Sequence, residues 1–138
     1  MISLADYFGA KVSQATPAQY AAAITMLDKV NDLLDHAAAE TSCDYLRVND
    51  ADTGSCISGA KGGAGDGGFR LASSTTGSAS SKHRTGHAVD VYDPGNKLDD
   101  WLTDEILARF SLWRERPEIT PGWCHLQDVV TLTGKRTS

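Results

Sequence analysis

The sequence predicts a single α+β domain in which helices pack on one side of a small, mainly antiparallel sheet. Its length of 138 residues, 41% of them hydrophobic, suits one globular domain spanning residues 1–138. One long amphipathic pattern predicts a helix, and two short segments of alternating polar and apolar residues predict strands. Together, these features favour a layer of helices covering one face of a sheet.

The first clear element is a helix that follows Thr16 and runs to Glu40. Thr16 can cap the helix, and Pro17 is favoured at the first helical position. Ser3 can cap a single helical turn before it. Residues three or four positions apart predict one buried stripe on the long helix, formed by Ile24, Leu27, Val30, Asn31 and Leu34.

A long loop is expected from Asn49 to Lys82, after a short strand at 45–48. Gly, Ser, Thr, Asp and Ala dominate this stretch, which is typical of a functional loop. Residues 63–68 match the pattern GxGxxG but do not open a helix directly after a strand, so we expect no dinucleotide site. Their glycines are expected to let the backbone turn and approach another segment closely.

The second half of the chain alternates strands and helix. We expect a strand at 88–92, a turn at 93–96 and a helix from Leu98 to Phe110. The segment RERPEITPG contains two prolines and cannot be regular helix. A second strand is expected from Trp123 to Val130.

The strand pattern selects the polar residues that share a face. In an extended first strand, Asp90 points away from the two valines beside it. In the second strand, His125 shares a face with Trp123 and Gln127. His87 falls on the valine side of the first strand and is a poor partner for Asp90. We therefore expect Asp90 and His125 to face away from the core.

A metal site can be built from these residues. His83 lies in a loop that can fold over the end of the first strand, so His83, Asp90 and His125 could supply three ligands. Three protein ligands and an open fourth position are typical of catalytic Zn²⁺, which lowers the pKa of its bound water from ~15.7 toward ~7. The alternative is that the histidines are hydrogen-bonded within a loop and the aspartate caps a turn.

Charge and composition exclude several partners. A net charge of −5 argues against nucleic acid, and no apolar run reaches the ~20 residues of a membrane span. The N-terminus lacks the features of a signal peptide, which predicts a soluble protein made in the cytoplasm. The three cysteines are expected to be free thiols, with a bridge between Cys43 and Cys56 as the alternative. A monomer is expected.

The motif Ser81-x-His83-x-x-Gly86-x-Ala88-x-Asp90, followed by Trp123-x-His125, resembles the signature of a family of zinc peptidases. The family includes D-alanyl-D-alanine carboxypeptidases and phage L-alanyl-D-glutamate endopeptidases, and its fold is shared with the hedgehog signalling domain. The resemblance implies that His83, Asp90 and His125 bind Zn²⁺ in a cleft on the open face of the sheet. It also implies that the substrate is a stem peptide of bacterial peptidoglycan.

The resemblance also suggests residues that contact the substrate. Gly68-Phe69-Arg70 is similar to the family's Ser-Gly-Tyr/Phe-Arg, whose arginine holds a substrate carboxylate or carbonyl. Arg70 is therefore expected to be catalytic and substrate-binding, because its guanidinium can fork onto two oxygens. Ser81, Trp123 and Gln127 are expected to bind substrate beside it. A role for Arg70 in bracing the loop is the alternative.

One departure from the family affects the mechanism. Many members place a Glu three residues before the last His, or a His two before it, and these positions are Gly122 and Trp123 here. Glu115 and Glu118 precede the last strand, and Glu115 is the expected general base. The alternative is that Glu115 forms a surface ion pair with the arginine on either side of it.

Two functional hypotheses follow from the sequence. The first is a peptidoglycan peptidase, phage or prophage encoded, that acts on the cell wall after release or as part of a virion. The second is a catalytically impaired zinc-binding virion or wall-binding module. A metal-free interaction domain is a third class, and it would show little loss of stability with a chelator.

Overall fold

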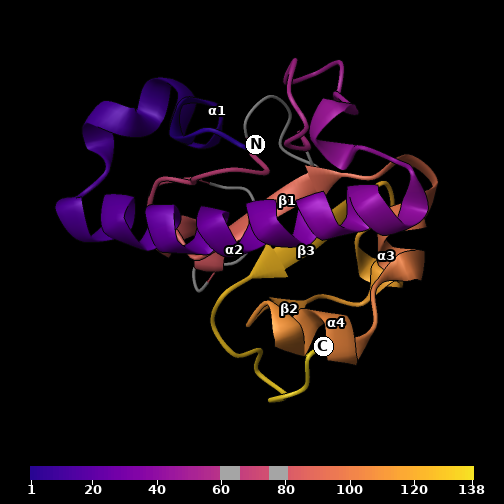
Figure 1. Cartoon of the computed structure of the whole chain (residues 1–138). Helices are drawn as coiled ribbons and strands as arrows, with labels where there is room; N and C mark the ends of the chain where they lie inside the picture. The colour runs from indigo at the N-terminus through magenta and orange to yellow at the C-terminus, as the bar shows by residue number, and fades with distance from the viewer. Residues whose placement is uncertain (60–65, 75–80) are drawn as a thin grey trace.

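The computed structural model describes residues 1–59, 66–74 and 81–138. The α+β class is confirmed, because a small antiparallel sheet of three strands packs against helices. The long helix α2 lies across the sheet, and the short helix α4 lies beside β2 (Figure 1). The elements are α1 (Leu4–Phe8), α2 (Pro17–Thr41), β1 (Ala88–Tyr92), α3 (Lys97–Trp101), α4 (Asp104–Arg109), β2 (Trp113–Arg114) and β3 (Trp123–Gln127).

Helix α2 begins where the sequence predicts. The Thr16 hydroxyl accepts a hydrogen bond from the Gln19 backbone N–H at 3.1 Å, and the Gln19 side chain accepts from the Thr16 N–H at 2.8 Å. This capping box satisfies two N–H groups that have no partner within the helix. The predicted stripe is wrong at Ile24, which is 42% exposed. The buried face is instead centred on Ala23, Met26, Leu27, Val30, Leu33, Leu34 and Ala37.

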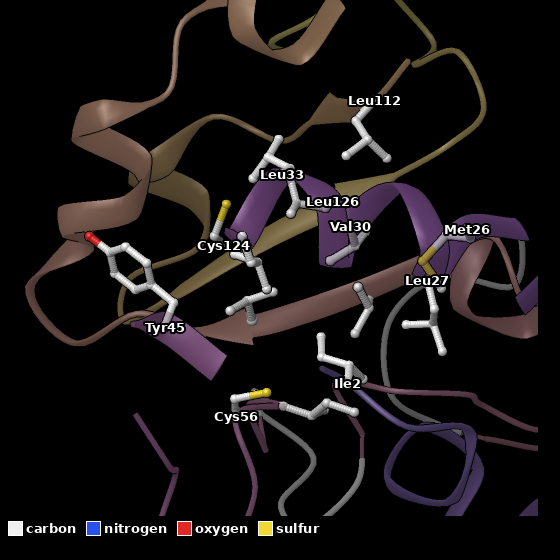
Figure 2. Packing of buried hydrophobic residues seen from close by; sticks show 14 of the residues in the cluster. Ile2, Met26, Leu27, Val30, Leu33, Tyr45, Cys56, Leu112, Cys124 and Leu126 are labelled. Carbon is white, nitrogen blue, oxygen red and sulfur yellow. The ribbon is translucent and has the colours of Figure 1, made fainter. Parts of the chain in front are cut away.

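The strands occur in the order β1-β3-β2, so β3 is the central strand. Asp90 pairs with His125 across β1 and β3, and Trp113 pairs with Gln127 across β2 and β3. One face of the sheet packs on α2 through buried side chains of both layers, several of which appear in Figure 2. On the sheet these are Val89, Val91, Cys124 and Leu126. Asp90 and His125 therefore point from the opposite face, as the strand pattern predicts.

Both outer edges of the sheet are covered. Beside β1, the Asp90 N–H donates to the Gly67 carbonyl at 2.7 Å, and the Asp90 carbonyl accepts from the Ser58 N–H at 2.9 Å. A Cβ at Gly67 would collide with the Ser58 carbonyl, which confirms the expected close approach. Residues 63–65 of the GxGxxG pattern lie outside the described residues. Beside β2, Arg114 forms a parallel bridge with Thr137.

Two predicted elements are wrong. Residues 45–48 contain a 3₁₀ turn rather than a strand, because the Asp44 side chain accepts a hydrogen bond from the Leu46 N–H at 3.2 Å. The predicted helix Leu98–Phe110 breaks into α3 and α4 at Leu102, where ψ is 137°. Thr103 caps α4 by accepting from the Ile106 N–H at 3.2 Å.

Three further features bear on the predictions. The last strand ends at Gln127 rather than at Val130. The three cysteines are free thiols, as expected. None of the helices in the described ranges has the length and apolar character that crossing a membrane requires.

Candidate metal centre

Three elements bring the predicted ligands together. His83 comes from a 3₁₀ turn (Lys82–Thr85), Asp90 from the middle of β1 and His125 from the middle of β3. One ligand atom from each residue lies within 4.8 Å of the other two. Asp90 and His125 meet because residues directly opposite each other in an antiparallel pair share a face.

The turn that carries His83 is fixed by its neighbours. The Ser81 hydroxyl accepts a hydrogen bond from the His83 backbone N–H at 3.3 Å. The turn ends at Gly86, whose φ of 82° favours glycine. A Cβ at Gly86 would meet the Gln19 carbonyl of α2, and the Gln19 side chain donates to the Arg84 carbonyl at 3.1 Å. The first turn of α2 therefore packs directly on the turn that carries His83.

Each candidate ligand is also held on the side that faces away from the other two. His83 Nδ1 lies 2.9 Å from the Gly68 carbonyl oxygen, and His125 Nε2 lies 2.8 Å from Gln127 Oε1. Asp90 Oδ2 accepts from Arg70 Nη2 at 3.4 Å. Partners of this kind orient metal-binding side chains and fix the histidine tautomer.

The three ligand atoms that face one another, His83 Nε2, Asp90 Oδ1 and His125 Nδ1, converge on one point. Asp90 Oδ1 lies 3.2 Å from His83 Nε2 and 3.0 Å from His125 Nδ1. The Gly68 carbonyl can only accept a hydrogen bond, so His83 Nδ1 carries a proton and the other ring nitrogen, Nε2, faces this point. There Nε2 can donate a proton to Asp90 or offer a lone pair to a metal ion. Lone pairs and a carboxylate oxygen repel one another at such distances unless a positive charge lies between them. Protons or a metal ion can supply that charge.

The electrostatics of the site agree with this geometry. Burial raises the pKa of Asp90, but the charges and hydrogen bonds of His83 and His125 outweigh burial and hold the pKa well below its usual range. Burial lowers the pKa of His125, and the hydrogen bond and charge of Asp90 outweigh burial and raise it. Two histidines and one carboxylate are a donor set that suits Zn²⁺ and related divalent ions. The group could therefore bind a metal ion.

The ligands lie beneath the surface. His83, Asp90 and His125 are 1%, 2% and 6% exposed. The site in this conformation is therefore more enclosed than the open cleft that the resemblance implies, and only His125 approaches the surface.

Arg70 is buried beside the ligands, and its side chain is 7% exposed. In addition to Asp90, its Nε donates to the Asp66 carbonyl at 2.6 Å, and its backbone N–H donates to the His83 carbonyl at 3.2 Å. Arg70 therefore anchors Asp90 and the surrounding loop. Its contact with substrate stays a prediction.

Glu115 lies on the other side of His125. Continuing the β2–β3 register by one residue places Glu115 opposite His125, and the negative charge of Glu115 contributes to the raised pKa of His125. The expected alternative of an ion pair with a neighbouring arginine is not found in the described part of the chain. Arg114 instead pairs with Asp99 at 3.2 Å, and Arg116 pairs with Glu118 at 3.7 Å.

The other predicted substrate-binding residues differ in their surroundings. Trp123 is half-buried on the face that carries His125. Ser81 is half-buried and caps the turn of His83. Gln127 is 6% exposed, and both ends of its amide bond to the protein. Sequence reasoning placed Gln127 on the correct face but missed its contact with His125, although their spacing of two residues in a strand allows it.

His87 lies outside the cluster, as the strand pattern predicts. Its Nδ1 is 2.7 Å from Asp128 Oδ1, and Lys29 Nζ lies 3.8 Å from Asp128 Oδ2. These contacts join the end of the sheet to α2. His87 is therefore a natural control for substitutions at the two candidate ligand histidines.

Comparisons of the chain with protein-family models, curated proteins and solved structures find no match. The fold and the site define a class: a small α+β domain with a buried cluster of two histidines and one aspartate that could bind a metal ion.

Proposed function

We propose that the protein is a zinc-dependent peptidase that hydrolyses peptide bonds in peptidoglycan stem peptides, as a DD-carboxypeptidase or endopeptidase. The proposal rests on the convergence of three ligand atoms from His83, Asp90 and His125. The other polar atom of each side chain contacts a second partner that fixes its orientation. The motif resemblance supplies the substrate class. On this proposal, the enzyme acts as a monomer on the cell wall, after release or as part of a virion.

The three ligands would hold Zn²⁺ and leave one position for water or substrate. A bound ion would polarise the scissile carbonyl and lower the pKa of a water molecule. The chain itself supplies the fixed geometry, because Gly68 orients His83, Gln127 orients His125 and Arg70 holds the second oxygen of Asp90. Arg70 can also present its guanidinium to a carboxylate or carbonyl of the stem peptide.

Glu115 would carry the proton. Its carboxylate accepts a proton from the attacking water as the new C–O bond forms, and it donates that proton to the leaving amine as the C–N bond breaks. Its position opposite His125 in the extended register and its influence on the pKa of His125 support this role. In the part of the chain that the structure describes, Glu115 has no ion pair that would hold its carboxylate elsewhere.

A metal-binding module without turnover is the second candidate. It is favoured by Gly122 at the position where many members of the resembled family carry the base. The low exposure of the three ligands also favours it, because a catalytic ion must be reached by substrate.

Zinc content and the release of amino termini from purified peptidoglycan, measured together, separate these candidates. We expect stoichiometric zinc and steady release for the wild type, and loss of both in His125→Ala. The matched control His87→Ala removes a histidine outside the cluster and should retain both. Stoichiometric zinc without any release would favour the module, and absence of zinc would overturn both proposals.

A further inference from the structure

We propose that Gln127 is a positioning residue that fixes the tautomer of His125, and that it takes its own orientation from the Val129 carbonyl. This inference rests on the proposed metal site but does not require peptidase activity. It assigns Gln127 to the support of a ligand rather than to contact with the substrate.

The direction of the Gln127 amide follows from its two partners. The Gln127 side-chain amide nitrogen donates to the Val129 carbonyl oxygen at 2.8 Å, and Oε1 lies 2.8 Å from His125 Nε2. A backbone carbonyl can only accept a hydrogen bond, so the NH₂ group must face Val129. The amide oxygen must then face His125.

The orientation of the Gln127 amide determines which nitrogen of the His125 ring carries a proton. An amide oxygen can only accept, so the ring nitrogen beside it, Nε2, must carry the proton. With Nε2 protonated, Nδ1 lies 3.0 Å from Asp90 Oδ1, where it donates to the carboxylate if the ring is a cation and offers a lone pair to a metal ion if the ring is neutral. In the opposite tautomer the proton on Nδ1 would satisfy Asp90 but occupy the place of a metal ion, and two acceptors would face each other at Gln127. The Gln127 oxygen therefore shifts the neutral ring toward the Nε2–H tautomer that a metal ion needs.

Burial and strand pairing hold the Gln127 side chain and its contacts with Val129 and His125 in place. Gln127 and His125 are each 6% exposed, so water does not readily replace a lost partner. The backbone of Gln127 is paired on both sides, with Ala88 of β1 and with Trp113 of β2. A side chain on the central strand, bonded at both ends of its amide, has little freedom to reorient.

The test compares Gln127→Leu with Gln127→Glu and with the exposed control Gln14→Leu. Zinc dissociation constants are measured, and the tautomer of the neutral His125 ring is read from ¹⁵N chemical shifts in zinc-free protein. We expect Gln127→Leu to weaken zinc binding about 10- to 100-fold, the usual effect of losing an outer partner, and to reduce the Nε2–H tautomer. Gln127→Glu keeps an acceptor beside His125 Nε2 but loses the donor to the Val129 carbonyl, so it should keep the Nε2–H tautomer while losing part of the zinc affinity. Gln14→Leu should match the wild type.

The outcomes separate this inference from the proposed function. An unchanged tautomer and unchanged zinc affinity in a folded Gln127→Leu would overturn the role of Gln127. An equal shift of the ring tautomer in Gln127→Leu and Gln127→Glu would also overturn it, because the acceptor beside Nε2 would then not matter. If the wild type binds no zinc, the ring tautomer alone decides, and a shift away from Nε2–H in Gln127→Leu would still support the inference.

Discussion

The two sides of β3 hold their polar side chains in different ways. Toward β1, His83, Asp90 and Arg70 are buried and bonded to one another or to backbone carbonyls. Toward β2, Glu115 is half-buried and, among the described residues, makes no ion pair. A metal site needs ligands that are fixed in advance, whereas a group that transfers protons must reach both water and a leaving group. On the proposed function, metal binding and turnover should therefore be separable by mutation.

The largest effect is expected on the β2 side. Glu115→Gln removes the proposed base but none of the candidate ligands, so kcat for amino-terminus release should fall by roughly 10²- to 10⁴-fold while zinc affinity changes far less. Steady-state kinetics on peptidoglycan fragments and zinc titration together measure both quantities.

Glu118→Gln is the matched control, because Glu118 is exposed and pairs with Arg116 at 3.7 Å. It should leave kcat unchanged. Full activity in Glu115→Gln would show that another residue is the general base. The β2 side of β3 would then have no role in turnover.

A second substitution removes a contact within the buried cluster on the β1 side of β3. Arg70→Met removes a buried partner of the Asp90 carboxylate, which should lower the free energy of unfolding of the zinc-free protein by about 3 kcal/mol. The loss should be smaller in the zinc-loaded protein, because the ion supplies positive charge to the same carboxylate. Urea unfolding with and without zinc measures both values.

Arg47→Met serves as the control for this experiment. Arg47 is 87% exposed and pairs with Asp44 at the surface, so its loss should cost less than about 1 kcal/mol. An equal loss in Arg70→Met with and without zinc would argue against an ion beside Asp90.

The smallest expected effect is a dependence on pH. The pKa of His125 is raised in the folded protein, so its stabilisation is present below the unfolded value of ~6.5 and is lost as pH rises through the folded value. The pKa of Asp90 is lowered, so its stabilisation is present above ~3.9 and is lost as pH falls through the folded value. Zinc-free protein should therefore lose stability as pH rises above ~6.5.

Zinc binding should respond in the opposite sense. A metal ion needs the unprotonated ring nitrogen, so affinity should rise as His125 loses its proton. Thermal unfolding with and without zinc should show a difference in Tm that widens from about pH 6 to about pH 8. A difference that narrows over this range would contradict the assignment of His125 as a ligand.

The candidate site was partly predictable from the sequence because strands have a period of two. That period placed Asp90 and His125 on the face opposite the valines and excluded His87. His83 came from a loop, and its place depends on contacts with Gly68 and α2 that are distant in the chain. No local pattern reveals such contacts.

The errors in the fold have a different physical origin. Asp44 and Thr103 each accept a hydrogen bond from a backbone N–H a few residues ahead, which turns a predicted strand into a 3₁₀ turn and divides a predicted helix. The spacing of apolar residues alone does not show where such a capping hydrogen bond changes the predicted element. The long helix was predicted well because a capping signal and a buried stripe agree there.

The packing of α2 on the turn of His83 means that the start of that helix would respond to a metal ion bound by His83. Gln19 caps α2 and also bonds to the Arg84 carbonyl, 65 residues further along the chain. An ion that holds His83 in place would oppose opening of that turn and, through Gln19, fraying of the first helical turn. Amide hydrogen exchange at Tyr20 and Ala21 should therefore slow on zinc binding, although both residues are far from the ligands in the sequence.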